Sequence, residues 1–237
     1  MKIFAISDLH ISTNSNKPMD VFGGNWVNYL EKIFTDWQNK VSDEDIVLLG
    51  GDLSWAMSLD DAREDLQKLF NLKGTKVIIK GNHDYWWSAI SRVREVLPEN
   101  FYALQNDSIR LPGVVICGSR CWSVPGSPDF AEHDQKIYSR EAERLILSLK
   151  SAEKLRKEGD KLIALIHFPP FNAKFESTLF TELFERYNVD VVVYGHLHGK
   201  NVRSEKIVNK NEIKYYLTSC DQVNNELVEV MCYELKS

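Results

Sequence analysis

The chain has 237 residues, of which 43% are hydrophobic and 27% are charged, which is enough for one large globular domain. Its net charge of -5 and the lack of a dense Lys/Arg run argue against a broad surface for nucleic-acid phosphates. The first apolar run is too short for a signal peptide, and no later run approaches membrane-spanning length. We therefore expect a cytoplasmic protein without a membrane or nucleic-acid partner.

Short apolar runs rich in Val and Ile predict strands that are buried on both faces. They cover residues 2–6, 45–52, 75–84, 113–119, 161–168 and 189–198. Helical patterns lie between several of these runs, at residues 26–40, 59–70 and 139–159. Near the end of the chain, residues 212–219 and 226–235 are typical of two strands in hairpin order. This order predicts a single α/β domain over residues 1–237, with a mixed sheet.

Polar residues follow the predicted strands. Asp8 and His10 come after the first run, and residues two apart on an extended chain point to the same side. Later runs end in further polar residues: Asp52, then Asn82, His83 and Asp84, then His167, then His196 and His198. Because ligands bind in the crevice at the carboxyl ends of strands in open α/β sheets, we expect these side chains to share one site.

This cluster has the composition of a metal site. A lone histidine at a strand end is more often a hydrogen-bonded polar residue, but five of the six histidines lie at such ends. Without a metal or an anion, the crowding would leave buried groups unpaired at about 1–3 kcal/mol each. Carboxylate, imidazole and amide ligands without thiolate suit divalent Mn, Fe, Zn or Ni. The number of ligands predicts two divalent metal ions that share one carboxylate.

The order of these motifs resembles that of the calcineurin-like metallophosphoesterases, from residue 3 to about residue 200. The motifs are D-x-H at Asp8 to His10, G-D ending at Asp52, G-N-H-D from Gly81 to Asp84, a separate histidine at His167, and G-H-x-H from Gly195 to His198. The resemblance implies a four-layer α/β/β/α sandwich with mixed β-sheets. It also implies that Asp8, His10 and His198 hold one metal, that Asn82, His167 and His196 hold the other, and that Asp52 bridges them.

The resemblance gives His83 a different role, because the equivalent histidine of the family faces the substrate. We expect His83 to donate a hydrogen bond or a proton to the leaving oxygen. Asp84 is a second catalytic candidate that would orient His83. Alternatively, Asp84 is a carboxylate that supports the surrounding structure, and both interpretations stay open.

Large aromatic residues lie close to these motifs in the sequence. Trp55 follows Asp52, and Trp86 follows the G-N-H-D motif. Both are candidates for a substrate-binding rim that stacks on an aromatic or apolar leaving group. The alternative is packing of the loop bases against the core, which is the commoner role of such residues.

The segment from Pro112 to Asp134 is rich in Gly and Pro and contains Arg120. Long irregular segments of this kind are usually functional or mobile. Arg120 is therefore a candidate contact to a substrate phosphate, with a structural salt bridge as the alternative. The strings "GSRCW" and "KIYSRE" also resemble a bacterial subgroup of predicted phosphohydrolases.

We therefore predict a dinuclear metal-dependent phosphohydrolase, a phosphatase or phosphodiesterase. It would hydrolyse small phosphomonoesters or phosphodiesters by in-line attack of a metal-bridging hydroxide. A nuclease of the same family is one alternative, but it would need a basic groove or an added domain. A non-catalytic metal-binding scaffold is the other, and it should lack ligands or the leaving-group histidine.

Overall fold

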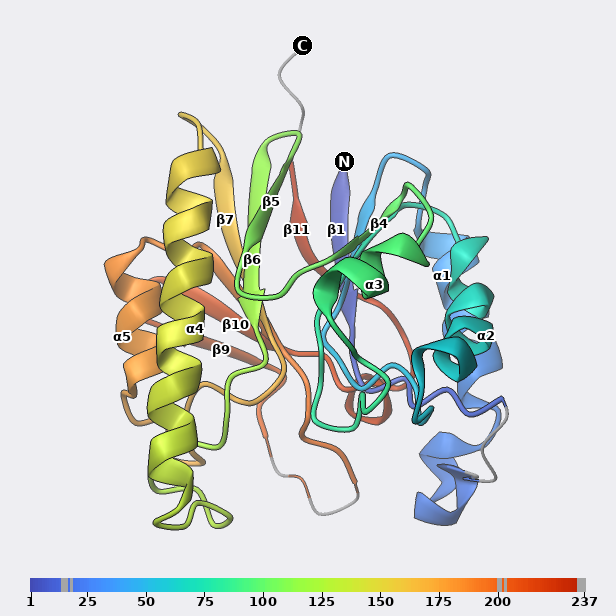
Figure 1. The fold of residues 1–237 in the computed structure, drawn as a ribbon, viewed down its shortest axis with the longest axis horizontal. Helices are drawn as coiled ribbons and strands as arrows, with labels where there is room; N and C mark the ends of the chain where they lie inside the picture. Colours follow the sequence, from blue (N-terminus) through green and yellow to red (C-terminus); the bar gives the residue numbers. More distant parts are fainter. Residues whose placement is uncertain (14–16, 18, 200–201, 203, 234–237) are drawn as a thin grey trace.

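Two mixed sheets pack face to face in the computed structural model, which describes residues 1–13, 17, 19–199, 202 and 204–233. Figure 1 shows helices α4 (Asp134–Leu155) and α5 (Leu179–Arg186) on one outer side, and α1 (Tyr29–Lys40) and α2 (Leu59–Phe70) on the other. The predicted four-layer α/β/β/α sandwich with mixed β-sheets is therefore confirmed.

The first sheet has five strands in the order β11-β1-β2-β3-β4. Four of them are parallel, and β11 pairs with β1 in the antiparallel direction. Residues of α1, α2 and the short helix α3 (Ile90–Glu95) pack on the outer face of this sheet. The strands are β1 (Lys2–Ile6), β2 (Ile46–Leu49), β3 (Thr75–Ile78), β4 (Phe101–Ala103) and β11 (Val228–Cys232).

The second sheet has six strands in the order β5-β6-β7-β8-β10-β9. Its four central strands are parallel, and the two edge strands are antiparallel to their neighbours. The strands are β5 (Ser108–Leu111), β6 (Val114–Ser119), β7 (Lys161–Ile166), β8 (Val191–Tyr194), β9 (Ile207–Lys210) and β10 (Ile213–Leu217). Three short 3₁₀ helices complete the elements: η1 (Met19–Phe22), η2 (Gly24–Trp26) and η3 (Cys220–Val223).

Alternation along the strands explains the layers. In β1, Ile3 and Ala5 face the core between the two sheets, whereas Phe4 and Ile6 face the core beneath the helices. The other central strands alternate in the same way, so apolar residues cover both of their faces. The two sheets therefore share one apolar layer, which holds their carboxyl ends at the same edge of the molecule.

The predicted C-terminal hairpin is wrong. Residues of β10 pair with β8 and β9, whereas β11 joins the other sheet beside β1, with η3 between them. The hairpin is instead β9–β10, and its turn residues Asn211 and Glu212 have φ angles of 50° and 64°. Alternating hydrophobicity marks a strand but does not specify which sheet the strand enters, and that choice depends on contacts far apart in the chain.

The predicted boundaries around α4 also shift. The helix begins at Asp134, five residues before the predicted start at residue 139, and Asp134 accepts a hydrogen bond from the Ala131 backbone at 2.8 Å. It ends at Leu155 rather than at residue 159, because Arg156 is already extended. The predicted irregular segment 112–134 contains β6, so its irregular part spans residues 120–133. Within the described residues, no helix has the length and apolarity that crossing a membrane requires.

Candidate metal centre

The loops that follow five parallel strands meet at one edge of the sandwich, at the lower end in Figure 1. The loop after β1 binds the loop after β2, since His10 N–H donates to Asp52 O at 2.9 Å. The loop after β8 binds the loop after β7 through Gly195 N–H and His167 O, at 3.1 Å. A further bond, from His196 N–H to Asp8 Oδ2 at 2.9 Å, joins the two sheets. The polar residues at the predicted strand ends are thus brought together.

The backbone at this edge is strained. Asp8, His10, Asp52 and His196 have φ angles of 61°, 45°, 52° and 70°. Left-handed conformations of residues other than glycine cost about 1–3 kcal/mol each, and they persist only where the surrounding structure enforces them. Such residues gather at functional sites, and all four of these are predicted metal ligands.

Glycines allow the loops to approach so closely. A Cβ atom on Gly81 would collide with the Oδ1 and N atoms of Asp52. A Cβ atom on Gly195 would lie 2.6 Å from Asp8 Oδ2. Both positions therefore require glycine for steric reasons.

Among the residues that the structure describes, two buried carboxylates of this cluster each have one oxygen without a hydrogen bond. Asp52 Oδ1 accepts from His83 N–H at 2.7 Å, but Asp52 Oδ2 has no donor. Asp52 Oδ2 lies 3.8 Å from His10 Nε2 and 3.5 Å from His167 Nε2. Asp8 Oδ1 is also without a partner, while its Oδ2 is bound as described above. A buried carboxylate oxygen without a donor is costly unless a cation is present.

Ring nitrogens of two imidazoles approach the side-chain oxygen of Asn82. The Nδ1–H of His167 donates to Gly50 O at 2.8 Å, so the Nε2 of a neutral ring carries a lone pair. That Nε2 lies 2.6 Å from Asn82 Oδ1, and His196 Nδ1 lies 2.9 Å from the same oxygen. The lone pairs of His167 Nε2 and Asn82 Oδ1 face each other, which is typical of ligands arranged around a cation.

His10 and His198 complete the cluster on its other side. His10 is buried, and neither of its ring nitrogens has a hydrogen-bond partner in the described part of the chain. The ring centroids of His10 and His198 lie 5.5 Å apart. Ligand atoms of Asp8, His10 and His198 all lie within 4.8 Å of one another, and the same holds for Asp8, Asp52 and His167. The two groups share Asp8, and the remaining proposed ligands adjoin His167 as described above.

Burial favours the neutral form of the imidazoles, which is the form that binds a metal ion. It lowers the pKa of His167 to about 3 and that of His196 to about 2, and it holds the pKa of His10 well below its usual range. These rings are therefore neutral at pH 7 and offer lone pairs. Burial also raises the pKa of Asp52 to about 6 and that of Asp8 well above its ordinary value. A bound cation would offset the cost of burying both carboxylates.

Asp84 is surrounded by hydrogen-bond donors. It accepts from the backbone N–H groups of Gly81, Asp52, Leu53 and Ser54, and from the indole Nε1–H of Trp86. These bonds tie the loop after β3 to the loop after β2. Burial raises the pKa of Asp84 to about 6. The contacts favour the interpretation of Asp84 as a carboxylate that holds the two loops, rather than one that orients His83.

His83 lies beside the ligand cluster and outside both carboxylate-containing groups. Its ring centroid is 4.7 Å from that of Trp55, 5.7 Å from that of His10 and 6.1 Å from that of Tyr85. Its Nδ1 has no hydrogen-bond partner among the residues that are described. The half-buried ring is thus adjacent to the proposed ligands without belonging to them.

The two predicted rim tryptophans have different surroundings. Trp55 is half-buried and stacks on His10, with ring centroids 4.7 Å apart and an interplanar angle of 19°. Trp86 is only 1% exposed, and its indole nitrogen donates to Asp84 at 2.8 Å. These contacts favour the packing role for Trp86, whereas Trp55 lies next to His83 at the candidate site.

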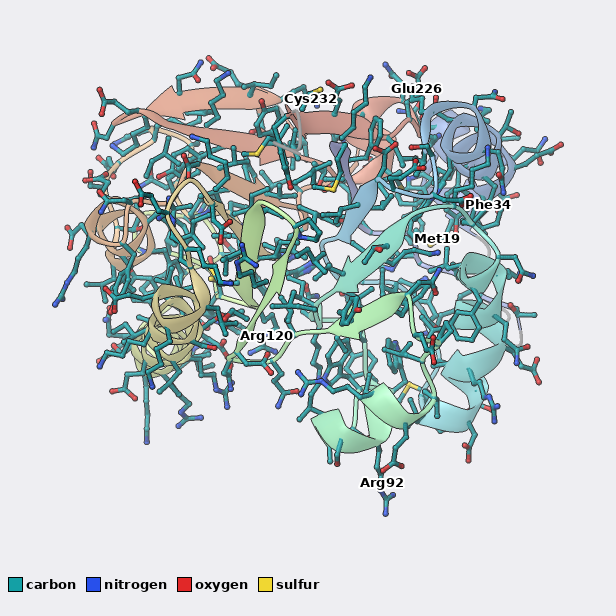
Figure 2. All side chains as sticks on the ribbon, turned by 90° about the horizontal axis from the view of Figure 1, so that it is seen from above. Met19, Phe34, Arg92, Arg120, Glu226 and Cys232 are labelled. Atoms are coloured by element: carbon teal, nitrogen blue, oxygen red, sulfur yellow. The ribbon has the colours of Figure 1, made fainter. Side chains whose placement is uncertain are left out.

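Arg120 lies between the half of the molecule that carries α4 and the half that carries α3 (Figure 2). Its Nη2 is 3.0 Å from Glu141 Oε1, so the salt bridge that was the alternative is present. Its carbonyl oxygen accepts from the backbone N–H groups of His167 and Phe168. Arg120 thus supports the loop that carries His167.

Two aromatic neighbours of the cluster were not predicted. The ring of Phe168 lies 4.1 Å from that of His196, at an angle of 34°. Trp26 contacts His10 and His198, at 6.1 and 6.2 Å between ring centroids. The position of Phe168 directly after His167 was a signal in the sequence. No sequence signal indicated Trp26, because it lies between the first two motifs and belongs to neither.

The four-layer sandwich and the polar cluster at its carboxyl edge together define a metallophosphoesterase-like protein. A comparison with family models gives a narrower result. The chain belongs to the calcineurin-like phosphoesterase family, whose model matches residues 1–200. Members of this family are generally metal-dependent phosphoesterases that bind two divalent metals. The buried Asp and His cluster is a possible metal site of this kind.

Solved structures share the fold. The protein TT1561 of Thermus thermophilus matches with a TM-score of 0.60 and 15% identity, over 95% of this chain and 96% of that chain. A protein of unknown function from Aquifex aeolicus, AQ665, matches with a TM-score of 0.51 and 17% identity, over 96% and 94% of the two chains. At these identities the similarity concerns the fold. The comparison with curated proteins finds no match.

Proposed function

We propose that the protein is a phosphoesterase that needs two divalent metal ions and hydrolyses small phosphoesters. The observation that carries this proposal is the convergence of three buried atoms without a partner among the described residues: Asp8 Oδ1, Asp52 Oδ2 and His10 Nε2, which lies 3.8 Å from that Asp52 oxygen. Each such atom costs about 1–3 kcal/mol when it is left unpaired. Cations would satisfy all of them together.

In this proposal, Asp8, His10 and His198 hold one ion, and Asn82, His167 and His196 hold the other. Asp52 lies between the two sets, and its free Oδ2 is within 4 Å of a ring nitrogen from each. When bound, divalent ions of this kind supply positive charge to phosphoryl oxygens and acidify water near neutral pH. The donor set of carboxylate, imidazole and amide fits Mn, Fe, Zn or Ni.

The chain's own residues orient the ligands and assist the leaving group. The Gly50 carbonyl fixes the His167 ring so that Nε2 faces the cluster. The bonds from Gly81, Asp52, Leu53 and Ser54 to Asp84 hold the loops that carry Asp52 and Asn82. His83, beside this cluster, donates a hydrogen bond or a proton to the leaving oxygen.

The two alternative functions are less well supported. A non-catalytic scaffold should lack ligands or the leaving-group histidine, and this chain has the full set. A nuclease should present a basic groove, whereas the net charge is -5. A small phosphoester is therefore the better candidate substrate.

The test combines metal analysis with turnover. Protein stripped with a chelator is incubated with Mn²⁺, and bound metal is then measured alongside hydrolysis of 4-nitrophenyl phosphate and bis(4-nitrophenyl) phosphate. We expect two metal equivalents per chain, a higher melting temperature and metal-dependent release of 4-nitrophenolate. Two bound equivalents without turnover of either ester would favour the scaffold, and if the same incubation with Mn²⁺, Fe²⁺, Zn²⁺ and Ni²⁺ in turn gave no bound metal, the site itself would be refuted.

A further inference from the structure

An apolar cavity of about 310 Å³ opens beside the candidate metal centre. Its lining includes His196, one of the proposed ligands, and Phe168, whose ring packs on His196 at 4.1 Å. The volume falls in the range of small-molecule sites, roughly 300–1,000 Å³. A group bound in this cavity would therefore lie next to a substrate phosphate held at the metal centre.

The walls of the cavity suit an uncharged, apolar group. Phe171, Phe175, Leu197 and Val124 contribute to the lining together with Phe168. Among the described residues, no Lys or Arg lines the cavity, and Asp129 adds a negative charge at its exposed side. An anionic substituent would be repelled there, whereas hydrocarbon would be removed from water.

A second cavity near the same edge has the opposite character. Its volume is about 280 Å³, and its lining includes Lys80, Arg120 and Arg144 against the single carboxylate of Glu141. A second phosphate or a carboxylate on a substrate would find cations in this second cavity. The apolar part of a substrate would instead bind in the first cavity, whose walls are apolar.

The apolar cavity and His83 belong to different parts of the site. The ring of His83 neighbours His10, Trp55 and Tyr85, and none of these residues lines the cavity. A leaving group assisted by His83 would thus lie away from Phe168. A monoester has only one organic group, which the leaving-group side would take, whereas a diester has a second one.

Building on the proposed function, we propose that the substrate is a phosphodiester and that the apolar cavity holds the organic group that stays on phosphorus. Water attacks the phosphorus and loses a proton, the bond from phosphorus to the leaving oxygen breaks, and that oxygen takes a proton from His83, which the proton lost by water replaces. The products are an alcohol or phenol and a phosphomonoester. The phosphomonoester keeps its apolar group in the cavity until release.

The experiment keeps the leaving group constant and varies the retained group. Alkyl 4-nitrophenyl phosphodiesters with methyl, butyl, hexyl or 5-carboxypentyl groups are compared with Mn²⁺-loaded protein. We expect kcat/KM to rise at least about tenfold from methyl to hexyl, because added methylenes leave water. The 5-carboxypentyl ester, which is similar in length but anionic, should fall back towards the methyl ester. 4-Nitrophenyl phosphate, which has no retained group, should be slower than the butyl diester.

A filling variant tests the location. Ala173 lines the cavity and is exposed, so Ala173→Trp should occupy the space without disturbing the core. This variant should flatten the alkyl series, so that the hexyl ester loses its advantage over the methyl ester. Ala131→Trp is the matched control, because Ala131 is also exposed but does not line the cavity, and it should keep the full series.

Binding of the product class gives a readout that needs no turnover. Calorimetry should show that hexyl phosphate binds the metal-loaded protein more tightly than methyl phosphate, and that Ala173→Trp removes the difference. If the diesters are not hydrolysed but this binding pattern appears, the cavity assignment stands and the proposed activity fails. If the diesters are hydrolysed at equal rates whatever their alkyl group, or if Ala173→Trp leaves the series intact, the cavity assignment is overturned and the activity stands.

Discussion

Asp45 and Asp52 lie at opposite ends of the same strand, β2, and their carboxylates have opposite surroundings. At the start of the strand, Asp45 accepts from Lys2 N–H at 2.7 Å and from both the N–H and the Oγ of Ser42. Both of its oxygens are therefore bound. At the carboxyl end, Asp52 Oδ2 has no donor within the described residues, although Asp52 is fully buried.

Carboxylates at β1, β7 and β8 extend this contrast. Asp160 precedes β7 and Asp190 precedes β8, and each has donors on both oxygens. Asp8, which follows β1, keeps one oxygen free. Carboxylates at the starts of the strands thus connect loops, whereas Asp8 and Asp52 at the other ends are left open towards a shared space. A buried carboxylate whose oxygens both accept hydrogen bonds supports the structure, whereas a buried carboxylate with one oxygen left without a donor indicates a binding site.

The largest expected effect is at Asp52. Asp52→Asn removes the charge between the two proposed ligand sets, so both metals should be weakened. We expect reduced metal content by elemental analysis and a loss of turnover of more than about 100-fold, the upper end for residues that only support a metal site. Full metal occupancy with wild-type turnover would rule out a bridging role.

Asp45→Asn is the control from the other end of the strand. It removes charge-assisted hydrogen bonds to Lys2 and Ser42 and should cost about 1–2 kcal/mol of unfolding free energy. Metal content and kcat should stay at the wild-type level. If Asp45→Asn depletes metal as Asp52→Asn does, the two ends of the strand do not differ in function.

The next effect concerns His83. Because its ring lies beside the ligand groups and not in them, His83→Ala should keep both metals. Turnover of esters with poor leaving groups should fall by about 10²–10⁴, and that of 4-nitrophenyl esters much less, since nitrophenolate barely needs a proton. His196→Ala and His198→Ala should instead lose metal and fail on all esters alike.

The histidine outside the strand ends serves as the control for His83. The side chain of His133 is 78% exposed and lies 3.4 Å from Asp134. His133→Ala should leave metal content and the dependence on leaving-group pKa unchanged. Metal loss in His83→Ala, or a drop that is the same for all leaving groups, would show that His83 does not assist the leaving oxygen.

A smaller effect is expected from the glycine that lets two site loops meet. In Gly81→Ala the added Cβ would collide with Asp52 Oδ1 and N, so Asp52 must move. We expect a loss of about 1–3 kcal/mol of stability, together with weaker metal binding in a metal titration. Gly24→Ala is the control, because a Cβ there meets nothing within 4 Å, and it should change stability by less than about 0.5 kcal/mol. Equal effects of the two substitutions would mean that the loop contact is not tight.

Much of the fold could be predicted from the sequence, because the central strands are apolar on both faces. The run at 161–168 contains β7, whose alternate residues face two different apolar cores. Only a strand between two layers needs such a pattern. The partner of β11 was not predictable in this way, because a half-buried edge strand fits either sheet until long-range contacts decide.

The position of the candidate site could also be predicted, whereas the roles of its neighbours could not. Strand-end positions brought Asp8, Asp52 and His167 together. The role of Asp84 could not be predicted, because four backbone N–H groups donate to it and a sequence does not show where backbone donors point. The burial of Trp86 was not predictable either, since it depends on the same carboxylate: the indole nitrogen of Trp86 is a further donor to Asp84. Which residues hold metal stays a prediction until metal content is measured.

The smallest expected effect belongs to the starts of the strands and depends on pH. The Arg110 guanidinium donates to both oxygens of Asp160, at 2.6 and 3.0 Å, and this interaction lowers the pKa of Asp160. A carboxyl group whose folded pKa is depressed stabilises the protein above its unfolded pKa, about 3.9, and this contribution is lost as the pH falls through the folded pKa. Asp160→Asn should therefore lower the unfolding free energy at pH 7 by about 1 kcal/mol or less, because the pair is partly exposed to solvent. In denaturant titrations the difference from wild type should shrink from about pH 5 to about pH 3, with metal content unchanged throughout.

Arg110→Met should give a similar loss, and the double variant little more, since both substitutions break the same pair. A difference that stays constant over this pH range would show that the ionised carboxylate of Asp160 adds nothing to stability, and a loss of metal would show that the two ends of the sheets are coupled.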